Sequence, residues 1–372
     1  MTVKNVIIVG SGPAGVGVAA LLNQSDIDYT ILEKNEVGNS FSKWPKNMHM
    51  ITPSFPSNAF GQMDLNSIIE ATSPAFTYKK EHLTGKEYAD YLRGISNHFD
   101  IHVETQTEVL QVSKHKEGYI VETNQGLYFC KYLIWAAGEY LNPQISTIQG
   151  SENCIHSSKI SDPMKLENDN YVVIGGYESG VQIAYDLVQN NKKVMLIDPS
   201  GIQDIYTSDP SKVLSPYTYE KYQKIKESSL FIEVLGQVNS VTKEENEYIL
   251  LLEDSRIIKT PNKPICATGF SLVKKPIEEF ILYREDGNPM LDEKTDEFIG
   301  HDNIYLSGPS VRHDNHIFCF IYKFRQRFGV IVEDILLKEE YEKEDVTILV
   351  EKWKRNGLYL SDLSCCDEEC VC

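Results

Sequence analysis

The feature that most constrains the fold of this chain is a strand, glycine loop, helix and strand pattern that occurs twice. The first copy has a buried strand at residues 6–9, a glycine loop at 10–15, an apolar helix through residue 22 and a strand at 29–32. It ends on Glu33, 23 positions after Gly10, and the second copy ends on Asp198, 23 positions after Gly175. Two β-α-β units of this size predict an α/β fold with two Rossmann-like dinucleotide-binding domains.

The first glycine loop has the residue types that a bound dinucleotide requires. Gly10 permits the tight turn, Gly12 lets the backbone approach a pyrophosphate, and Gly15 lets helix and strand pack closely. The following helix presents its first N–H groups to phosphate, and Glu33 can accept hydrogen bonds from a ribose diol. The loop therefore predicts a dinucleotide site.

The second glycine loop is less regular. Tyr177 stands where the middle glycine is expected, so we expect it to crowd a pyrophosphate or to displace it. Asp198 occupies the ribose position, and a carboxylate there repels a 2′-phosphate, which favours NADH over NADPH. The candidate nicotinamide-cofactor residues are Gly175, Gly176, Tyr177, Glu178, Ser179, Gly180 and Asp198.

The rest of the chain predicts further strands and one long helix. The strands are expected at 101–104, 109–113, 119–123, 132–137, 264–268 and 304–307, and the helix at about 316–338. The second unit looks inserted into the first. This predicts a first dinucleotide-binding domain at 1–160 and 271–360, a second at 161–270 and a cysteine-rich tail at 361–372.

The composition of the chain limits the kinds of binding partner that we expect. A formal net charge of −18 argues against nucleic acid and anionic membrane surfaces. No apolar stretch approaches the roughly 20 residues that span a bilayer, and the first residues lack a signal-peptide pattern. We expect a cytoplasmic enzyme with a small-molecule substrate, compatible with a homodimer, and we predict no metal site.

The eight cysteines fall into two groups. Cys130, Cys154, Cys266 and Cys319 are scattered and are typical of small buried residues in a reducing compartment. The other four crowd the last eight residues as Cys365, Cys366, Cys370 and Cys372, among three acidic residues. This tail indicates redox chemistry, soft-metal or metalloid capture, or partner binding, and zinc fits it poorly because adjacent cysteines lack the usual spacer.

Taken together, these motifs resemble the two-dinucleotide-binding-domain flavoproteins, and among them bacterial flavin-containing monooxygenases. The resemblance rests on residues 10–15, 38–44, 52–55, 136–138, 150–157, 175–180, 267–270 and 304–309, and the nearest group shares the Ser-Cys-Cys-x-x-x-Cys-x-Cys terminus. It implies FAD in the first unit and NAD(P)H in the second. The implied FAD residues are Gly10, Ser11, Gly12, Pro13, Ala14, Gly15, Glu33, Lys34, Ser40, Phe41, Trp44, Thr52, Val109, Ala137, Gly138 and Gly308.

Three departures from the family patterns bear on the chemistry. Five residues separate Gly150 from His156, where the monooxygenase signature has three, and Tyr177 replaces a glycine. Pro309 follows Gly308, where many flavin disulfide reductases have an aspartate. The first two departures weaken a monooxygenase assignment, and the third weakens the reductase alternative.

The electron acceptor stays open between alternatives. A monooxygenase would use a dry pocket, which residues 41–60 could line, with Asn58 as a candidate for steadying an oxygenated flavin and a turn role as its alternative. A thiol, disulfide or metalloid reductase would use Cys365 and Cys366, since the usual flavin-linked dithiols are absent and Ala14 replaces the loop cysteine of bacillithiol-disulfide-reductase-like proteins. A flavin-bound redox sensor is the non-enzymatic alternative.

Several other residues have structural interpretations. Ser215 and Pro216 predict the start of a helix. His313 and His316 could flank the flavin or bind a metal, but surface or helix-capping roles are expected for both. Lys323, Arg325 and Arg327 are expected on the solvated or salt-bridged face of the long helix.

Overall fold

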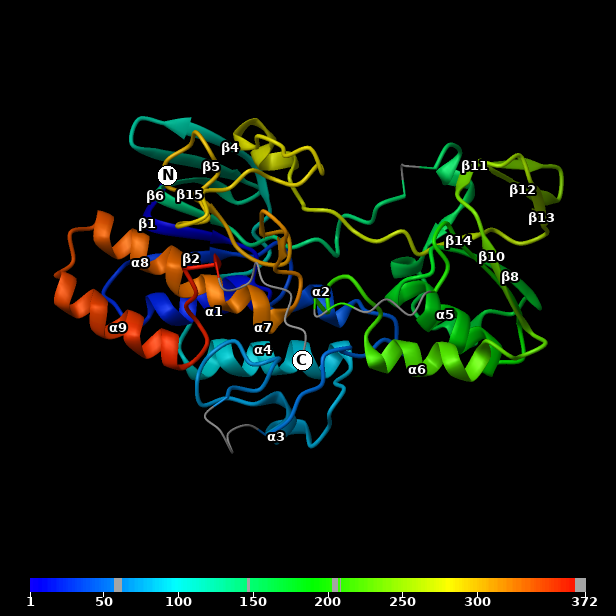
Figure 1. Ribbon diagram of the computed structural model, residues 1–372. Coiled ribbons are helices and arrows are strands. Elements are labelled where there is room, and N and C mark those ends of the chain that lie inside the picture. Colours follow the sequence, from blue (N-terminus) through cyan, green and yellow to red (C-terminus); the bar gives the residue numbers. More distant parts are fainter. Residues whose placement is uncertain (57–61, 146–147, 203–206, 208, 365–372) are drawn as a thin grey trace. The chain divides into compact units, whose positions relative to one another are not determined.

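The computed structural model describes residues 1–372 except 57–61, 146–147, 203–206, 208 and 365–372 (Figure 1). The chain folds into two compact units. The first unit comprises Met1–Ser42, Thr52–Glu139 and the described residues from Leu272 onward, and the second comprises Lys43–Ile51 and Tyr140–Ser271. The second unit therefore interrupts the first along the sequence.

The first unit is built on a seven-stranded sheet in the order β3-β2-β1-β6-β5-β4, with β15 also paired to β6. The strands are β1 (Thr2–Val9), β2 (Tyr29–Leu32), β3 (Val103–Glu104), β4 (Val109–His115), β5 (Gly118–Thr123), β6 (Gly126–Trp135) and β15 (Ile304–Leu306). β1 pairs in parallel with β2 and β6, and β15 pairs in parallel with β6. The register aligns Val9 with Leu32 and Trp135, and Trp135 with Leu306. The carboxyl ends of these four strands therefore meet at one edge of the sheet.

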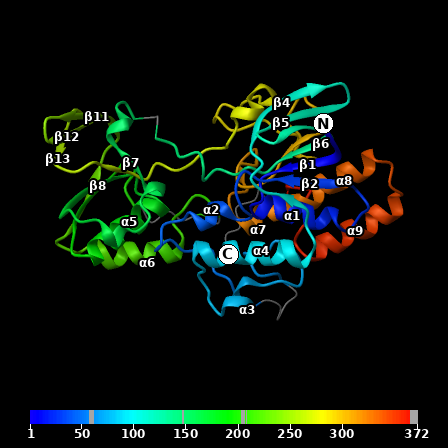
Figure 2. The same cartoon turned by 180° about the vertical axis from the view of Figure 1, so that it is seen from behind.

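Helices cover this sheet and extend the unit (Figures 1 and 2). They are α1 (Pro13–Leu22), α2 (Asn39–Ser42), α3 (Pro74–Tyr78), α4 (Gly85–His98), α7 (Ile321–Phe324), α8 (Phe328–Lys338) and α9 (Lys343–Arg355). α8 packs on α1 so closely that a Cβ on Gly17 would lie 2.1 Å from the Phe328 ring. α4 begins with a capping box of Thr84 and Glu87, a stabilising pair at a helix start.

The second unit has its own five-stranded parallel sheet in the order β10-β9-β8-β14-β7. Its strands are β7 (Ile155–His156), β8 (Asn170–Ile174), β9 (Lys193–Asp198), β10 (Phe231–Leu235) and β14 (Ile265–Cys266), and a meander adds β11 (Val238–Glu244), β12 (Glu247–Leu252) and β13 (Ile257–Thr260). The helices are α5 (Glu178–Gln189) and α6 (Pro216–Ile225). Because β7 pairs with β14, the residues just before 160 belong to this sheet.

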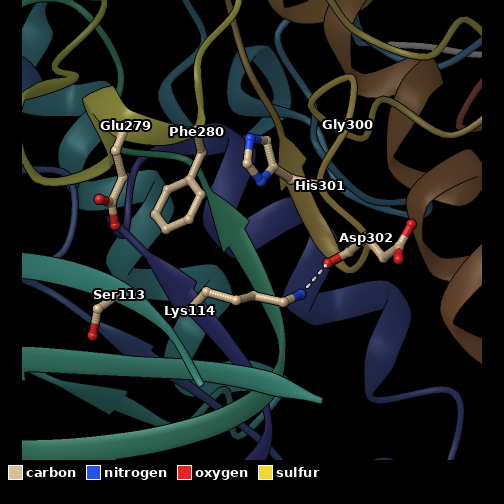
Figure 3. A pocket seen from close by; sticks show the side chains of 7 residues that line it. All are labelled: Ser113, Lys114, Glu279, Phe280, Gly300, His301 and Asp302. Carbon is tan, nitrogen blue, oxygen red and sulfur yellow. Dashed lines mark hydrogen bonds between the residues drawn. The ribbon is translucent and has the colours of Figure 1, made fainter. Parts of the chain in front are cut away.

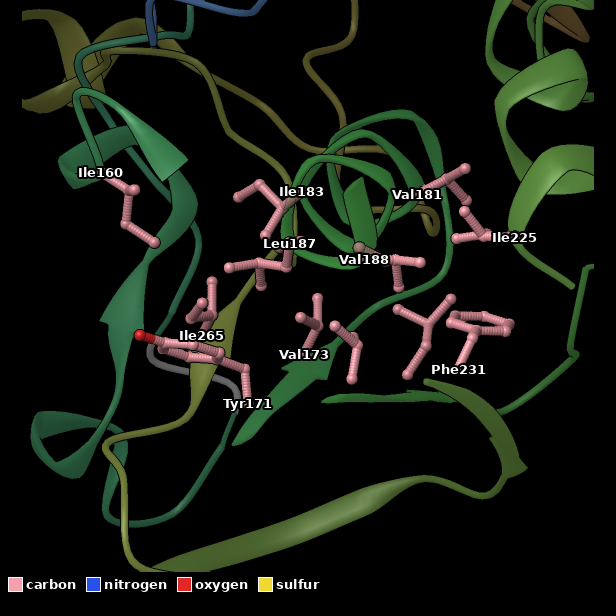
Figure 4. Close-up of a cluster of buried hydrophobic side chains, with 14 residues drawn as sticks. Ile160, Tyr171, Val173, Val181, Ile183, Leu187, Val188, Ile225, Phe231 and Ile265 are labelled. Carbon is pink, nitrogen blue, oxygen red and sulfur yellow. The ribbon is translucent and has the colours of Figure 1, made fainter. Parts of the chain in front are cut away.

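The two faces of the second sheet are buried in separate apolar clusters. One side packs Val173, Leu196 and Ile265 against Val181 and Leu187 of α5 (Figure 4). The other side packs Val172, Ile174 and Cys266 against Val241 and Leu250 of the meander. Burial on both faces is why these strands read as continuous apolar runs in the sequence.

Sequence prediction was wrong about the long helix at 316–338. Arg312–His313 and His316–Ile317 instead form a small antiparallel hairpin, β16 and β17, whose turn includes Asp314 with φ of 44°. The helical part starts only at Ile321 and changes to a 3-10 turn at Arg325–Arg327 before α8 begins. Hydrogen bonding in the hairpin takes the backbone groups that a longer helix would have used.

The surface role expected for His313 and the solvated alternative for Arg325 and Arg327 are wrong, because all three side chains are buried, whereas the salt-bridged alternative holds for Arg327. Arg327 forms a salt bridge with Asp296, which also bonds His313 at 2.6 Å. Arg325 Nη1 donates to the carbonyl oxygens of Asp64 and Ser67. The spacing of polar and apolar residues along a short helical stretch does not show that segments distant in the sequence cover these three side chains.

Candidate functional site

The first glycine loop lies at the carboxyl edge of the first sheet, between β1 and α1. Gly10 has φ of +101°, and a Cβ there would lie 2.6 Å from the carbonyl oxygen of Ala136. A Cβ on Gly15 would lie 1.9 Å from the carbonyl oxygen of Gly10. By contrast, a Cβ on Gly12 would meet nothing within 4 Å, so space is open at the residue where a pyrophosphate would approach.

The start of α1 is left available to an anion. Gly12 is its N-cap residue and supplies no side-chain hydrogen bond, and Pro13 occupies the first turn. Helix N-termini carry unpaired N–H groups and a partial positive charge. Ser11, Pro13 and Ala14 thus complete a loop that could hold a diphosphate.

Glu33 is held rigidly at the end of β2. Its Oε2 accepts hydrogen bonds from the Ser11 N–H at 2.9 Å and from the Ser11 hydroxyl at 2.8 Å. Its Oε1 accepts from the Asn35 N–H at 2.8 Å. Oε2 already accepts two hydrogen bonds, but Oε1 accepts only one and keeps a second lone pair, so the fixed carboxylate can still accept from a ribose hydroxyl.

Other predicted FAD residues lie around this loop. The Gly38 N–H donates to the Ser11 carbonyl at 3.1 Å, which brings α2, with Ser40 and Phe41, to the loop. The Phe41 ring lies 4.7 Å from that of Tyr88. The Thr107 N–H donates to the Glu33 carbonyl at 2.8 Å, and Val109, the first residue of β4, follows two positions later.

Two more of the predicted FAD residues, Lys34 and Thr52, contact other residues of the first unit. Lys34 forms a 2.6 Å ion pair with Glu108, and both side chains are exposed. Thr52 is buried, and its carbonyl accepts from Asn66 Nδ2 at 2.9 Å. These contacts fix both residues within the first unit, and their roles toward FAD stay predictions.

The ends of β6 and β15 complete the edge. The Ala136 N–H donates to the Val9 carbonyl, and Ala137 and Gly138 follow. A Cβ on Gly308 would lie 3.3 Å from Ala14, so the segment after β15 meets the start of α1. Ser307 Oγ is buried here without a hydrogen-bond partner among the described residues. An orphaned hydroxyl beside an open glycine loop fits a site that a polar ligand completes.

The second glycine loop repeats this geometry in the second unit. Gly175 has φ of +102°, and a Cβ there would lie 2.6 Å from the carbonyl oxygen of Ala267. Asp198 Oδ2 accepts from the Gly176 N–H at 2.7 Å, and Oδ1 accepts from the Ser200 N–H at 2.9 Å. A Cβ on Gly176 would lie 2.9 Å from the Cβ of Asp198. Aspartate is shorter than the glutamate at the equivalent place in the first unit, and the glycine leaves room for it to approach the loop.

Tyr177, which the sequence predicts to crowd or displace a pyrophosphate, makes a hydrogen bond to the segment before α6. Its side chain is 46% exposed, and its hydroxyl donates to the Val213 carbonyl at 2.7 Å. Tyr177 is the N-cap residue of α5 and makes no side-chain cap hydrogen bond. The first N–H groups of α5, including that of Ser179, are therefore not capped by it, and the tyrosine instead fixes the segment before α6.

Glu178 joins α5 to α6. Its carboxylate accepts from the Ser215 N–H at 2.6 Å, from the Ser215 hydroxyl at 3.1 Å and from Thr218. Ser215 is the N-cap of α6, with Pro216 behind it, which confirms the predicted helix start. Burial raises the pKa of Glu178, while its hydrogen bonds oppose that shift. The side chain is thus engaged within the protein.

A second group of ionisable residues lies between α5 and α6. Gln182 Nε2 donates to Asp186 Oδ2 at 2.9 Å, Lys221 donates to Gln182, and the Lys221 ammonium lies 3.6 Å from the centroid of the Tyr217 ring. Burial raises the pKa of Asp186 to about 6. Burial also lowers the pKa of Lys221 to about 8, although the two charges attract. Desolvation outweighs their attraction at both groups.

Some predicted residues lie outside the first unit or outside the described residues. Trp44 falls in Lys43–Ile51, which belongs to the second unit. Asn58, Cys365 and Cys366 lie outside the described residues. Of the four cysteines within them, Cys130, Cys154 and Cys266 are buried, as expected, and Cys319 is partly exposed. The described residues contain no group of three or more side chains that could hold a metal ion.

A hollow of about 530 Å³ in the first unit is lined by Ser113, Lys114, Glu279, Phe280, Gly300, His301 and Asp302 (Figure 3). The Phe280 and His301 rings lie 5.2 Å apart, and Lys114 donates to the Asp302 carbonyl at 3.3 Å. Asp302 precedes the first residue of β15, whereas Ser307 follows its last. The hollow is therefore at the opposite end of β15 from the glycine loop.

Besides Ser307, two residues beside the glycine loop were not predicted from the sequence. Glu139 directly follows Gly138, and Ser310 follows Gly308 by two positions. The Ser310 hydroxyl donates to Glu139 Oε1 at 2.5 Å, across 171 positions of sequence. The sequence did offer a signal for both, because each is a polar residue that closely follows a strand ending in glycine, Gly138 or Gly308.

These features define a class, the flavoproteins with two dinucleotide-binding domains. The sequence profile of a family described as pyridine nucleotide-disulphide oxidoreductase matches residues 7–308. The chain belongs to this family. Membership implies FAD and NAD(P)H as cofactors, and the open first loop with its orphaned Ser307 hydroxyl fits a bound dinucleotide.

Two curated relatives show how far the similarity extends. The chain is 31% identical over 186 residues to the uncharacterised oxidoreductase CzcO of Bacillus subtilis, a match that covers 49% of this chain and 51% of that protein. It thus spans about half the length of the first curated relatives it matches. It is 24% identical over 352 residues to bacilliredoxin reductase Bdr of Bacillus subtilis, covering 92% of this chain and 100% of that protein.

Solved structures share the fold over most of the chain. The bacillithiol disulfide reductase Bdr from Staphylococcus aureus matches with a TM-score of 0.74 at 21% identity, covering 91% of this chain and 100% of that one. A flavin-containing monooxygenase from Stenotrophomonas maltophilia matches with a TM-score of 0.69 at 16% identity, covering 91% and 99%. Among the described residues, none of the helices has the length and apolar character needed to cross a membrane.

Proposed function

We propose that this protein is an FAD-dependent oxidoreductase that oxidises NAD(P)H and passes the electrons to molecular oxygen, acting as a monooxygenase on a small molecule. The observation that carries the proposal is the lack of a cysteine in the first glycine loop, where Ala14 packs against Gly308. Reduction of a disulfide requires a nucleophilic thiolate, and the described cysteines near the sheet are buried in apolar cores. The fold similarity to a flavin-containing monooxygenase supports the same function.

The proposed roles follow from the geometry of each unit. Gly10, Gly12 and Gly15 with the α1 N-terminus would hold the FAD diphosphate, and Glu33 would orient its ribose. Gly175, Gly176 and Gly180 with the α5 N-terminus would hold NAD(P)H in the same way. FAD supplies the chemistry of hydride acceptance and electron transfer, and the protein binds and orients both cofactors.

Asp198 sets the proposed preference between the two nicotinamide cofactors. Both of its oxygens already accept backbone N–H bonds, so the carboxylate cannot turn away from a bound ribose. A 2′-phosphate next to this fixed negative charge is repelled, whereas a 2′-hydroxyl can donate to it. NADH should therefore serve at least as well as NADPH.

The test follows NADH consumption by the purified protein with and without oxygen. A panel of small amines and thioethers is added in air, and products are examined by mass spectrometry for the gain of one oxygen atom. Oxygen-dependent NADH consumption that yields such a product, or hydrogen peroxide when no substrate fits, supports the proposal. NADH consumption that needs an added disulfide and proceeds equally without oxygen contradicts it.

The second candidate is an NAD(P)H-dependent thiol, disulfide or metalloid reductase, favoured by the similarity to bacilliredoxin reductase along almost the whole chain. Its dithiol would be the terminal cysteines. Leu360 is fixed in the first unit because its carbonyl accepts from Arg327 and its N–H donates to the Gln326 carbonyl. Cys365 follows five positions later.

A double variant separates this candidate from the first. Cys365→Ser with Cys366→Ser should abolish anaerobic turnover of disulfides or metalloids if the tail carries electrons, while FAD content stays unchanged. Cys319→Ser is the control, since this thiol lies in the described part of the first unit. Unchanged rates toward every such acceptor in the double variant would remove the reductase candidate.

A further inference from the structure

Glu139 and Ser310 form a polar pair at the carboxyl edge of the first sheet. Glu139 lies three residues beyond Ala136, whose carbonyl faces Gly10, and Ser310 lies two residues beyond Gly308, which meets Ala14. Their hydrogen bond therefore joins the loops after β6 and β15 next to the first glycine loop. This is the edge where α/β sheets bind their ligands.

The protein surroundings of the Glu139 carboxyl group favour its neutral, protonated form relative to the same group in water. The Glu139 side chain is partly buried, and burial raises its pKa, while the Ser310 hydrogen bond and the Arg312 charge lower it. Arg312 is itself held by donating Nη1 to the Pro309 and Val311 carbonyls at 2.5 and 2.7 Å. Burial and these two neighbours thus act on the pKa of one carboxyl group in opposite directions, an arrangement typical of acid–base groups at functional sites.

Few other charges act on the pair. The segment after residue 271 packs along β6, since the Val273 N–H donates to the Gly138 carbonyl. Of its two lysines, Lys274 is directed to the Tyr283 ring at 4.6 Å and to Glu278 at 3.8 Å, and Lys275 is exposed. The start of α1, Pro13 and Ala14, brings no charge. Arg312 is thus the charged neighbour that acts on Glu139.

We infer that Glu139, anchored by Ser310, is the group that donates and accepts a proton at the proposed FAD site. The inference rests on the proposed function, because it assumes that FAD occupies the first glycine loop. Hydride from NAD(P)H brings two electrons and one proton, and a second proton is needed to complete the reduction without added charge. Glu139 would release this proton by breaking its O–H bond, which leaves a carboxylate that faces Arg312, and it would regain a proton from water.

The test measures how the bound flavin responds to pH. The visible absorbance of the oxidised protein is titrated with acid and base, and the rate of anaerobic reduction by NADH is measured over the same range. In the wild type, both should show one shared inflection. Glu139→Gln should retain FAD and lose this inflection, with reduction slowed by at least ~10² below the wild-type inflection, where Glu139 is protonated, and unchanged above it.

Ser310→Ala gives a directional check. Without the hydroxyl, the carboxylate loses a hydrogen bond that stabilises it, so the inflection should move to higher pH rather than vanish. Glu285→Gln removes an exposed carboxyl of the same unit and should leave the curve unchanged. A structural role alone would alter FAD retention in Glu139→Gln and Ser310→Ala without these opposite effects on the inflection.

The possible failures are distinguishable. An inflection that persists in Glu139→Gln, or that does not move in Ser310→Ala, overturns the role of Glu139 while the FAD site stands. If Glu139→Gln does not retain FAD, Glu139→Asp provides the second variant, and a curve identical to that of the wild type in Glu139→Asp also overturns the role. Wild-type protein that binds FAD but is not reduced by NADH or NADPH contradicts the proposed function itself.

Discussion

Two acidic residues perform the same task in the two units. Glu33 binds the N–H of Ser11, and Asp198 binds that of Gly176, which stands at the equivalent place in its loop. Both could be predicted from spacing alone, because a residue at the end of the second strand of a β-α-β unit must face the first loop. What spacing could not show is that Gly176 gives the shorter aspartate room to approach.

Asp198→Asn tests the cofactor preference. Removing the charge while keeping the shape should raise the ratio of the NADPH rate to the NADH rate by about tenfold, since a neutral group no longer repels the 2′-phosphate. The rates are measured by stopped-flow reduction of the flavin. Asp254→Asn, at an exposed turn of the same unit, should leave the ratio unchanged. A wild-type protein with a strong preference for NADPH would contradict the role given to Asp198.

At the scale of elements, α5 and α6 enclose a carboxylate that folding partly desolvates. Burial raises the pKa of Asp186 to about 6 from an ordinary value of 3.8, so the folded state holds its proton more tightly than the unfolded state. The destabilisation is absent below about pH 4, grows as the pH rises to 6 and is complete above it. Lys221 stays protonated through this window.

Asp186→Asn should therefore become more favourable relative to wild type as the pH rises. The difference in free energy of unfolding, variant minus wild type, should increase by about 2 kcal/mol between pH 4 and pH 7. Urea titrations at several pH values measure it. Asp169→Asn, exposed in the same unit, is the control. A difference that falls with pH would mean that the attraction of Lys221 outweighs desolvation.

The contact of α8 with the C-terminal segment depends on Arg327. Its guanidinium binds Asp296 with two nitrogens and also donates to the carbonyls of Leu360 and Glu293. Removing one partner of a buried ion pair leaves the other charge uncompensated. Arg327→Met should lower the free energy of unfolding by about 3–5 kcal/mol, measured with urea, whereas Arg355→Met, at an exposed position of α9, should cost less than about 1 kcal/mol.

Helices and strands were predicted correctly where a periodic apolar pattern lies next to a glycine. They were predicted wrongly where contacts with distant segments determine the local structure. The strand at 29–32 is found as predicted, because its four residues are buried on both faces. The start of α8 was placed too early, since the β16–β17 hairpin has no periodic signal of its own. Arg327 was assigned to a solvated or salt-bridged face; the salt bridge is present, with Asp296, but nothing local shows that it is buried.

For the whole molecule, sequence alone indicated two dinucleotide-binding units with one inserted in the other, and the family match confirms the class. The candidate site was predicted as far as the glycine loops and their acidic partners. Glu139, Ser307 and Ser310 were not, because they are brought to the loop only when β6 and β15 pair. Contacts between such distant segments are set by the sheet and not by any local pattern.

The most direct measurement of the central claim is an anaerobic titration of the purified protein with NADH, followed by visible absorbance. The account predicts a yellow protein that releases FAD on denaturation and whose flavin absorbance is lost with one equivalent of NADH per bound FAD. A colourless protein without FAD, or a flavin that neither NADH nor NADPH reduces, would contradict it.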